Sequence, residues 1–554
     1  MKKTAILALA TLPLISSCAG GTGSRHADDG EQTLEVFAIK LGFGSDWCKN
    51  LLDAFEKEDW VKEKYPNLKV YFETSADRSA IGTRLSAGEG VNTVDLVFSD
   101  GLSGYLGKDN MGKEYSVNLT NTVYNTKVPG EDVTVYEKLQ DDYKKDVMYF
   151  EYGQSAFDND LPFNSYSFYW GSGMMGIVYN EEILRDSFGY SVPPRTTDEF
   201  IECLKKVTAG NESYNKGYAL MYSNGGEYSQ YLYNTWWGQY EGYENYFNYY
   251  QGVSFDGDEY VEKSSDIFQQ TGRKEAMNAL IQMVGNNTYR YSKGAATDFK
   301  AAQKYFLKGE GVFMANGDWF AEEMKDDAAK SKYTFKMMKT PIVSAIRNRT
   351  PSIKSDEVLA KVVQAIDDGK GTAAASGIEG VTEEDYAIIM EARGIIYSLG
   401  AGYDSFIPSY AKSKDVACDF LRFMATDKAQ LIYSKSTGGA SLPFQYDHKK
   451  DTEAYAGYSD LQKSRLDMVE SGVYKTQTLP MGNNYPLSKF GHLSEWSSFA
   501  LSGGQVIDYA KRGSLNAADS TSAKAAYDRD IEYWTANNGN KWNDCLRLAG
   551  YFNN

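Results

Sequence analysis

Leu34-Glu35-Val36-Phe37-Ala38-Ile39 opens the part of the chain whose pattern decides the fold. Its β-branched and aromatic residues favour a strand. After Ser45, the expected helix cap, Trp47, Leu51 and Phe55 recur at four-residue spacing, which predicts a helix with one apolar face. Further strands are predicted at 69–73 and 94–98, with a helix at 80–87 between them. Strands separated by helices imply an α/β unit with a parallel sheet and right-handed crossovers.

A second block repeats this architecture. Gly176-Ile177-Val178-Tyr179 has the composition of a buried strand, and a helix follows with Thr197 as its expected cap. Phe200, Ile201, Leu204 and Val207 line the buried face of that helix. About 520 residues follow the N-terminal region, more than one core accommodates, so at least two lobes are expected. Residues 346–396 are interpreted as an inserted helical segment.

The first 18 residues have the pattern of an export signal. Lys2 and Lys3 precede an apolar run at 5–15 that is too short to span a bilayer. Ile15-Ser16-Ser17-Cys18 resembles the bacterial lipobox, in which the cysteine becomes lipid-modified. A plain signal peptide with a chance cysteine is the alternative. Residues 19–33 are rich in glycine and polar side chains, which is typical of a flexible tether. We therefore expect an extracytoplasmic protein anchored to the cell membrane by lipid on Cys18.

Charge and cysteine content exclude some classes of function. The net charge of −17 argues against a nucleic-acid partner, which requires clustered Lys and Arg. The cysteines, at 18, 48, 203, 418 and 545, lack the close spacing of a zinc or redox site. Beyond Cys18, buried free thiols are expected, with a single disulfide as the alternative. The sequence indicates no metal site and no cofactor.

Landmarks along nearly the whole mature chain resemble the extracellular solute-binding proteins of family 1, the carbohydrate-binding group that includes the maltose-binding protein. The most specific is QKYF at 303–306 followed by GEGVFMANGDW at 309–319. The others, in order, are DLVFSD at 95–100, IVYNEEIL at 177–184, PPRTTDEF at 193–200, MKTP at 338–341, ACDFLRFM at 417–424 and GGASLP at 438–443. Thr197 stands where the family commonly has tryptophan, and the insertion at 346–396 departs from the maltose-binding pattern.

The resemblance implies a two-lobed, periplasmic-binding-protein-like α/β fold of type II with a ligand cleft between the lobes. The N-terminal lobe would comprise 34–165 plus 397–432, and the C-terminal lobe 166–345 plus 433–554. Hinges are expected near 160–175, 340–345 and 430–440. The protein would be a monomer that closes on a carbohydrate, which we expect to be an oligosaccharide, and delivers it to the permease subunits of an ABC importer.

A saccharide site needs aromatic rings for stacking and polar side chains for the hydroxyl groups. Tyrosine, with 43 residues, is abundant in this chain. By the resemblance, Trp319, Asp318 and the C-terminal Trp496 are candidate ligand residues. The remaining candidates lie after the first and third strands, near the first crossing segment and in a Tyr-rich stretch: Trp47, Ser99, Asp100, Trp170, Glu227, Tyr231, Trp236 and Trp237. For each of these residues, core packing or loop capping is the alternative.

Other functions have less support. A glycoside hydrolase would need two placed carboxylates, and the 75 acidic residues leave that open, but no catalytic motif is present. We therefore expect a protein that is not an enzyme. A binding protein for peptides or polyamines is the main alternative, because the same fold serves many solutes. A purely structural or adhesive surface lipoprotein is a third possibility.

Overall fold

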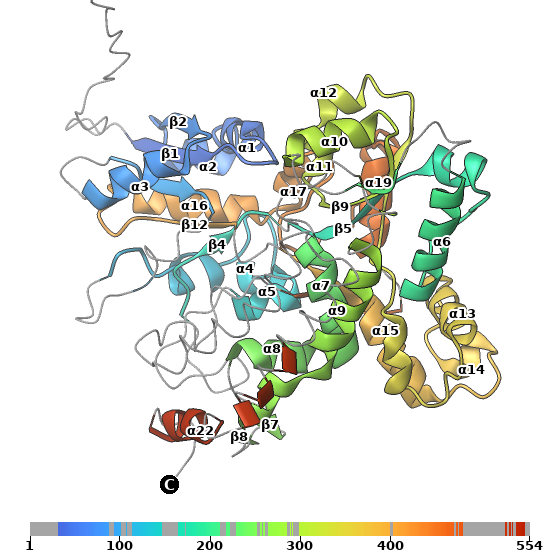
Figure 1. The fold of residues 1–554 in the computed structure, drawn as a ribbon. Coiled ribbons are helices and arrows are strands. Elements are labelled where there is room, and N and C mark those ends of the chain that lie inside the picture. The colour runs from blue at the N-terminus through green and yellow to red at the C-terminus, as the bar shows by residue number, and fades with distance from the viewer. Residues whose placement is uncertain are drawn as a thin grey trace, which may run out of the picture.

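The computed structural model describes most of the chain from residue 32 onward. The described residues are 32–87, 93–100, 107, 114–146, 164–171, 173–210, 218–221, 229–251, 255–256, 259–260, 264–284, 289, 291, 298–398, 403–469, 473–474, 476–479, 527–528, 531–532, 534–535 and 539–548. They form two α/β lobes, each built around its own sheet (Figure 1).

Five strands form the sheet of the first lobe, in the order β2-β1-β3-β12-β4. They are β1 (Thr33–Ile39), β2 (Lys69–Ser75), β3 (Leu96–Phe98), β4 (Phe168–Tyr169) and β12 (Asp404–Phe406). The helices of this lobe include α1 (Asp46–Phe55), α2 (Asp59–Lys64), α3 (Arg78–Ala87), α16 (Lys414–Met424) and α17 (Asp427–Ser436). As the four-residue spacing predicts, α1 buries Trp47, Leu51 and Phe55.

Four strands form the sheet of the second lobe, in the order β10-β5-β9-β6. They are β5 (Met175–Asn180), β6 (Tyr218–Met221), β9 (Gly311–Gly317) and β10 (Phe335–Met338). Around them lie α6 (Thr197–Ala209), α7 (Ser229–Glu241), α9 (Thr271–Val284), α10 (Phe299–Leu307), α11 (Phe320–Glu323), α12 (Lys325–Ala328) and α19 (Asp460–Val469). The second lobe thus repeats the α/β composition of the first.

Further helices and strands lie outside these two sets. They are η2 (Thr120–Tyr124), α4 (Val135–Lys138), α5 (Asp141–Asp146), η3 (Ile183–Ser187), α8 (Tyr243–Gln251), β7 (Phe255–Asp256), β8 (Glu259–Tyr260), η5 (Ser264–Gln269), η7 (Ser344–Asn348), β11 (Ile395–Tyr397), α18 (Thr452–Ala456), β13 (Gln477–Leu479) and α22 (Gly539–Leu548). The 346–396 segment contains α13 (Asp356–Asp367), α14 (Ala373–Ser376) and α15 (Glu383–Gly394). Thr196 Oγ1 joins this segment to the second lobe by donating a hydrogen bond to Asp356 Oδ2 at 2.6 Å.

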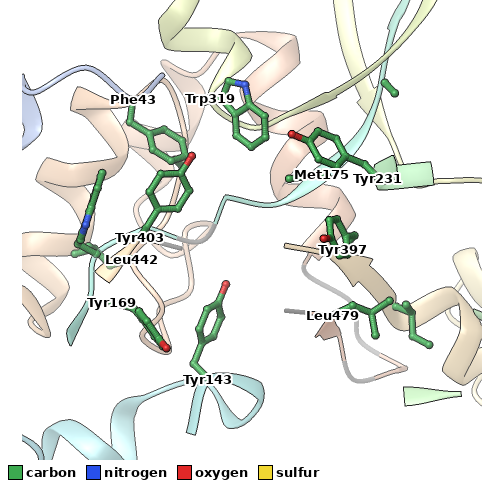
Figure 2. Packing of buried hydrophobic residues seen from close by; sticks show 14 of the residues in the cluster. Phe43, Tyr143, Tyr169, Met175, Tyr231, Trp319, Tyr397, Tyr403, Leu442 and Leu479 are labelled. Carbon is green, nitrogen blue, oxygen red and sulfur yellow. The ribbon is translucent and has the colours of Figure 1, made fainter. Parts of the chain in front are cut away.

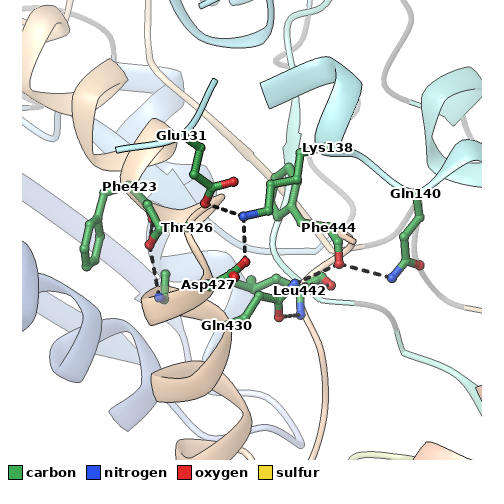
Figure 3. Close-up of polar contacts among 10 residues, drawn as sticks. Glu131, Lys138, Gln140, Phe423, Thr426, Asp427, Gln430, Leu442 and Phe444 are labelled. Atoms are coloured by element: carbon green, nitrogen blue, oxygen red, sulfur yellow. Dashed lines mark hydrogen bonds and ion pairs between the residues drawn. The ribbon is translucent and has the colours of Figure 1, made fainter. Parts of the chain in front are cut away.

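The chain crosses between the lobes more than once. One crossing joins β4, which ends at Tyr169, to β5, which begins at Met175, inside the expected range 160–175. A second joins β11 to β12. A third follows α17, where Leu442–Gln445 is still fixed to the first lobe (Figure 3). Gln430 Nε2 donates to the carbonyls of Leu442 and Phe444 at 2.9 and 3.0 Å, and the Gln445 amide donates to Lys138.

The same region holds a buried cation. Lys138 Nζ lies 2.5 Å from Glu131 Oε1 and 2.8 Å from Asp427 Oδ1, although the lysine side chain itself is almost fully buried. These bonds link α4 to α17 beside the 442–445 segment (Figure 3). Beyond Gln445 the chain reaches the second lobe, where Lys449 pairs with Asp467 of α19 at 3.1 Å. The third crossing therefore lies after the expected range 430–440.

Three sequence expectations about local structure were wrong. Residues 340–345 are not a hinge, because Ile342 exchanges backbone hydrogen bonds with Arg195 and Thr197 inside the second lobe. The cap of α6 is Thr196, whose Oγ1 accepts the Glu199 amide at 3.1 Å, since Thr197 is already helical. The sheets are mixed rather than parallel: strands that follow a crossing, such as β5 and β12, pair antiparallel with their neighbours.

Ser45 stands at the N-cap of α1, but its side chain makes no capping hydrogen bond there. Cys48, Cys203 and Cys418 are buried free thiols, as expected. Cys18 lies outside the described residues, and the side chain of Cys545 is not described. In the described part of the chain, no helix is both long enough and apolar enough to cross a membrane.

Candidate functional site

Five aromatic rings form a continuous series between the lobes, which we call the interlobe aromatic cluster: Phe43, Tyr231, Trp319, Tyr397 and Tyr403. Trp319 meets Phe43 edge to face at 6.4 Å between ring centroids, and it meets Tyr231 in the same way at 6.3 Å. Tyr403 lies 5.4 Å from Phe43, and Tyr397 lies 5.9 Å from Tyr231. Figure 2 shows these rings, with Tyr143, directed toward the region between the lobes.

Different elements supply these rings. Phe43 follows β1 and Tyr403 precedes β12, so both belong to the first lobe. Trp319 follows β9 and Tyr231 lies on α7, so both belong to the second. The cluster therefore joins the two lobes, and edge-to-face pairs of this kind contribute roughly 0.5–1.5 kcal/mol each beyond the area they bury.

Polar groups accompany the aromatic cluster. Burial raises the pKa of Tyr403, and the negative charges of Asp318 and Asp100 act in the same direction. Burial likewise raises the pKa of Tyr433, with Asp318 again the largest charge acting on it. Tyr433 Oη is buried and has no hydrogen-bond partner among the residues that the structure describes. The hydroxyl groups of Tyr403 and Tyr433 are therefore both subject to the negative charge of Asp318.

A buried polar chain begins at Asp318. Arg465 of α19 places Nη2 at 3.1 Å from Asp318 Oδ2, and both side chains are almost fully buried. Arg465 Nη1 donates to Ser441 Oγ at 2.7 Å, and Ser441 Oγ lies 3.0 Å from His448 Nε2. Burial, followed by the charge of Arg465, lowers the pKa of His448 to about 4. The imidazole is therefore neutral near pH 7.

This chain borders a pocket of about 610 Å³. Ser441, His448 and Arg465 line it together with Met174 of the first crossing segment and Asp142 of α5. The volume lies within the range of about 300–1,000 Å³ typical of small-molecule sites. Because the wall combines a crossing segment with residues bound to either lobe, the pocket lies between the lobes. Arg465, one of its lining residues, pairs with Asp318, which precedes Trp319 of the aromatic cluster in the sequence.

A second pocket, of about 560 Å³, lies elsewhere. It is lined by residues of α13, α15, β10 and α19, among them Asp367 and Arg393, and by Lys339, which follows β10. Arg393 binds Asp367 through two hydrogen bonds of 2.9 and 2.8 Å. This pocket lies between the 346–396 segment and the second lobe, so the first pocket is the better candidate for an interlobe ligand.

The structure brings some of the sequence candidates together. Trp319 (6% exposed) and Tyr231 (8% exposed) both belong to the interlobe aromatic cluster, and the charges of Asp318 and Asp100 raise the pKa of Tyr403 beyond the effect of burial. Ser99 is buried beside them at the end of β3, where its carbonyl accepts the Trp170 indole N–H at 3.1 Å. These residues stay candidates for ligand contact.

Four other candidate ligand residues, all tryptophans, are fully buried inside the lobes. Trp47 and Trp170 are fully buried and stack on each other at 4.7 Å. Trp236 and Trp237 are also fully buried, and their indole N–H groups donate to the Pro341 carbonyl and to Gln270 Oε1. In this arrangement the four tryptophans belong to the cores of the lobes. Glu227 and Trp496 lie outside the described residues.

Sequence reasoning missed Tyr397, Tyr403, Ser441, His448 and Arg465. The family-like run at 438–443 pointed to the neighbourhood of Ser441, but nothing local marks Arg465 or His448. In the part of the chain that the structure describes, no group of three or more His, Cys, Asp or Glu side chains is arranged to hold a metal ion.

Solved structures of similar fold cover almost the whole chain. A probable secreted solute-binding lipoprotein from Streptomyces coelicolor is 12% identical with a TM-score of 0.52, covering 91% of this chain and 100% of its own. An ABC substrate-binding protein from Listeria monocytogenes, in complex with cycloalternan, is 13% identical with a TM-score of 0.51, covering 91% and 99%. RafE from Streptococcus pneumoniae is 13% identical with a TM-score of 0.50, covering 91% and 98%.

At these identities the likeness shows the fold alone. Comparison with curated protein sequences finds no significant match. A model of the family described as bacterial extracellular solute-binding protein matches residues 49–431, which is more than half of the sequence. The chain therefore belongs to the family of bacterial extracellular solute-binding proteins.

Proposed function

We propose that this protein captures a carbohydrate, an oligosaccharide, between its two lobes and delivers it to the permease of an ABC importer. The observation that carries the proposal is the interlobe aromatic cluster beside a polar pocket. Sugars present flat C–H faces and hydroxyl edges, which match aromatic rings and hydrogen-bonding groups respectively. The cycloalternan complex of the Listeria protein supports the same ligand class for this fold.

Closure of the lobes is the proposed mechanism of capture. Trp319 and Tyr231 come from the second lobe, whereas Phe43 and Tyr403 come from the first, so a ligand between them would contact both. A ligand that binds the closed arrangement more tightly shifts the population toward it. The permease would then recognise the closed form. We propose lobe boundaries close to those expected from the sequence, with β4 assigned to the first lobe because it pairs with β12.

Membrane anchoring through Cys18 is part of the proposal. The support is the lipobox-like sequence at 15–18, followed by the tether-like segment 19–33. Growth of an expressing bacterium with labelled palmitate should label the wild-type protein and leave Cys18→Ser unlabelled. Release of the wild-type protein into the medium without label would refute the anchor.

Hydrolysis is the competing function. The family consists of binding proteins, and the buried carboxylate of Asp318 is held by Arg465 in an ion pair. A saccharide that binds should therefore be recovered unchanged after prolonged incubation. Chromatography of the recovered ligand distinguishes binding from hydrolysis, because shortened products would favour a surface glycoside hydrolase.

Thermal unfolding with a panel of solutes tests the ligand class. Mono- and oligosaccharides, amino acids, peptides and polyamines are compared, each at high concentration. A ligand at 100 times its Kd adds about 2.7 kcal/mol to the free energy of unfolding. We expect stabilisation by at least one oligosaccharide. Stabilisation by peptides or polyamines alone would contradict the carbohydrate proposal.

Variants locate the site. Trp319→Ala should abolish the ligand-induced rise in melting temperature, because it removes the ring that joins Phe43 to Tyr231. Tyr71→Ala is the control, since Tyr71 is an exposed aromatic residue on the edge strand β2. An unchanged ligand response in Trp319→Ala would place the site elsewhere.

A further inference from the structure

Residues 138–140 and 443–445 run antiparallel to each other beside the interlobe pocket, and we call this pair of segments the pocket ribbon. Leu139 and Phe444 stand opposite each other in it, and both side chains are buried. Two backbone hydrogen bonds, of 3.0 and 2.8 Å, join the segments on either side of this pair. The ion pairs of Lys138 tie the same ribbon to α17. The ribbon is therefore fixed to the first lobe.

Two glutamines of the pocket ribbon line the pocket. Gln140 and Gln445 each follow a residue of the buried pair, and side chains alternate in direction along an extended segment. They are therefore directed away from the core, and both are lining residues of the pocket. Their positions are diagonal across the ribbon. Backbone positions of this kind lie about 7–8 Å apart, a distance that long side chains can bridge to reach one ligand.

The carboxamide of Gln140 has a defined orientation. The Phe444 carbonyl accepts hydrogen bonds from Gln430 Nε2 at 3.0 Å and from Gln140 Nε2 at 3.3 Å. Because a carbonyl only accepts, the nitrogen of Gln140 faces it and the oxygen lies on the far side, as Figure 3 shows. Gln140 Oε1 accepts no hydrogen bond from any residue that the structure describes, and it is not among the buried oxygens. It is an accessible acceptor.

Gln445 and Tyr446 add uncharged groups to the same wall. The Gln445 side chain is exposed, and its carboxamide makes no hydrogen bond within the described part of the chain. Tyr446 is half-buried, and its ring meets His448 in a T-shaped arrangement at 4.8 Å between centroids. Its Oη is accessible and bonds to no described residue. Burial raises the pKa of Tyr446, so the hydroxyl keeps its proton at neutral pH.

We propose that Gln140, Gln445 and Tyr446 form a subsite that recognises hydroxyl groups of the bound sugar, with one hydroxyl donating its proton to Gln140 Oε1. This inference rests on the proposed function and adds to it the contacting residues and the need for a donor at one position of the ligand. A hydroxyl donates one hydrogen bond while it accepts others. It can therefore serve the oxygen of Gln140 and accept from Gln445 or Tyr446 at the same time.

The pocket ribbon gives this subsite its selectivity. The backbone hydrogen bonds and the contact with the Phe444 carbonyl hold Gln140 in place before the solute arrives, which reduces the ordering cost of binding. An ether or methylated oxygen at the same position of the ligand has no proton to donate. It would leave the carboxamide oxygen facing another acceptor.

Conservative substitutions remove these groups one at a time. Gln140→Met and Gln445→Met replace a carboxamide by an unbranched side chain of similar length, and Tyr446→Phe removes only the hydroxyl. The matched controls are Gln364→Met and Tyr190→Phe, because both residues are half-buried and neither lines this pocket. Thermal unfolding without ligand checks that each variant is folded.

Calorimetric titration of the full-length protein gives the Kd of each variant. The probe is the sugar that stabilises the wild-type protein most among maltotriose, cellotriose, xylotriose and chitotriose. A net hydrogen bond of about 0.5–1.5 kcal/mol corresponds to a change of about three- to tenfold in Kd. We expect that loss in each of the three pocket variants and less than about twofold in the two controls. Wild-type affinity in Gln140→Met would overturn this inference and leave the proposed function intact.

Monodeoxy analogues of the same sugar distinguish a direct contact from a general disturbance of the pocket. In the wild-type protein, the analogue that lacks the donating hydroxyl should bind about three- to tenfold more weakly. In Gln140→Met the same analogue should lose less than about twofold, because the partner of that hydroxyl is already absent. An equal loss in both proteins for every analogue would overturn the inference. If none of the sugars binds the wild-type protein, the proposed function and this inference both fail.

Discussion

Trp319 of the second lobe packs directly against Gly42 of the first. A Cβ atom built on Gly42 would lie 2.9 Å from Trp319 Cβ and 3.0 Å from two ring carbons. Real Cβ atoms essentially never approach so closely, so any side chain at 42 must displace the tryptophan. The absence of a side chain at this position lets the two lobes meet.

Gly42→Ala should therefore weaken ligand binding. The added methyl group would push Trp319 away from Phe43 and oppose the close approach of the lobes, and we expect a loss of tenfold or more in affinity. Calorimetric titration with the ligand measures it. Gly371→Ala is the matched control, because the nearest atoms to its new Cβ lie at 3.9–4.0 Å. Equal affinities of the two variants would show that the Gly42 contact does not govern binding.

Arg465→Met should destabilise the fold strongly. The substitution leaves the buried carboxylate of Asp318 without the guanidinium that compensates its charge. Removing one partner of a buried ion pair typically costs about 3–5 kcal/mol. Chemical denaturation measures this loss. The double variant Asp318→Asn with Arg465→Met should recover part of it, and a double variant less stable than Arg465→Met would contradict the pairing argument.

Stability should fall in mild acid because of His448. Its pKa is lowered from 6.5 to about 4 in the folded protein, so the unfolded chain binds the proton first as the pH falls. The contribution is fully present above pH 6.5 and is lost progressively toward pH 4. At about 1.4 kcal/mol per pKa unit, the loss approaches about 3 kcal/mol.

Carboxylates titrate in the same pH range. The test of this pH dependence therefore compares the stability of wild type with that of a variant that lacks the histidine. The charged groups acting on His448 are Arg465 and Asp447. Denaturation of wild type and His448→Gln between pH 4 and 7 isolates the histidine, because glutamine takes up no proton. Parallel stability curves for the two proteins would refute the prediction.

Cys48, Cys203 and Cys418 should resist alkylation in the native protein. All three are buried, and burial raises the pKa of Cys203 to about 12 and that of Cys418 to about 11. The reactive thiolate is therefore scarce at pH 8. Mass spectrometry after iodoacetamide treatment should find these three unmodified until denaturant is added. Modification of any of them in the native state would show that its site opens to solvent.

Structural features that depend on a few neighbouring residues, such as the buried face of a helix, were predicted well from the sequence. The four-residue spacing of Trp47, Leu51 and Phe55 predicted the buried face of α1. The cap of α6 was misplaced by one residue because Thr196 and Thr197 are equally good capping residues, and only the backbone conformation distinguishes them.

Hinge positions were harder to predict. The segment 340–345 has the proline and small residues of a connection, but its hydrogen bonds with Arg195 and Thr197 hold it inside the second lobe. Which segment crosses between lobes depends on strand pairing between distant parts of the chain, such as β12 with β3 and β4. No local pattern encodes that pairing.

The sequence by itself determined the α/β character, the family landmarks and their order, because periodicity and short motifs act over a few residues. Only the tertiary structure decided which side chains meet. Trp47 and Trp319 both follow a strand, yet Trp47 is fully buried and Trp319 joins the lobes. Asp318, Ser441 and Arg465 come together because the chain crosses between the lobes repeatedly, and burial then forces their charges and hydrogen-bonding groups to pair with one another.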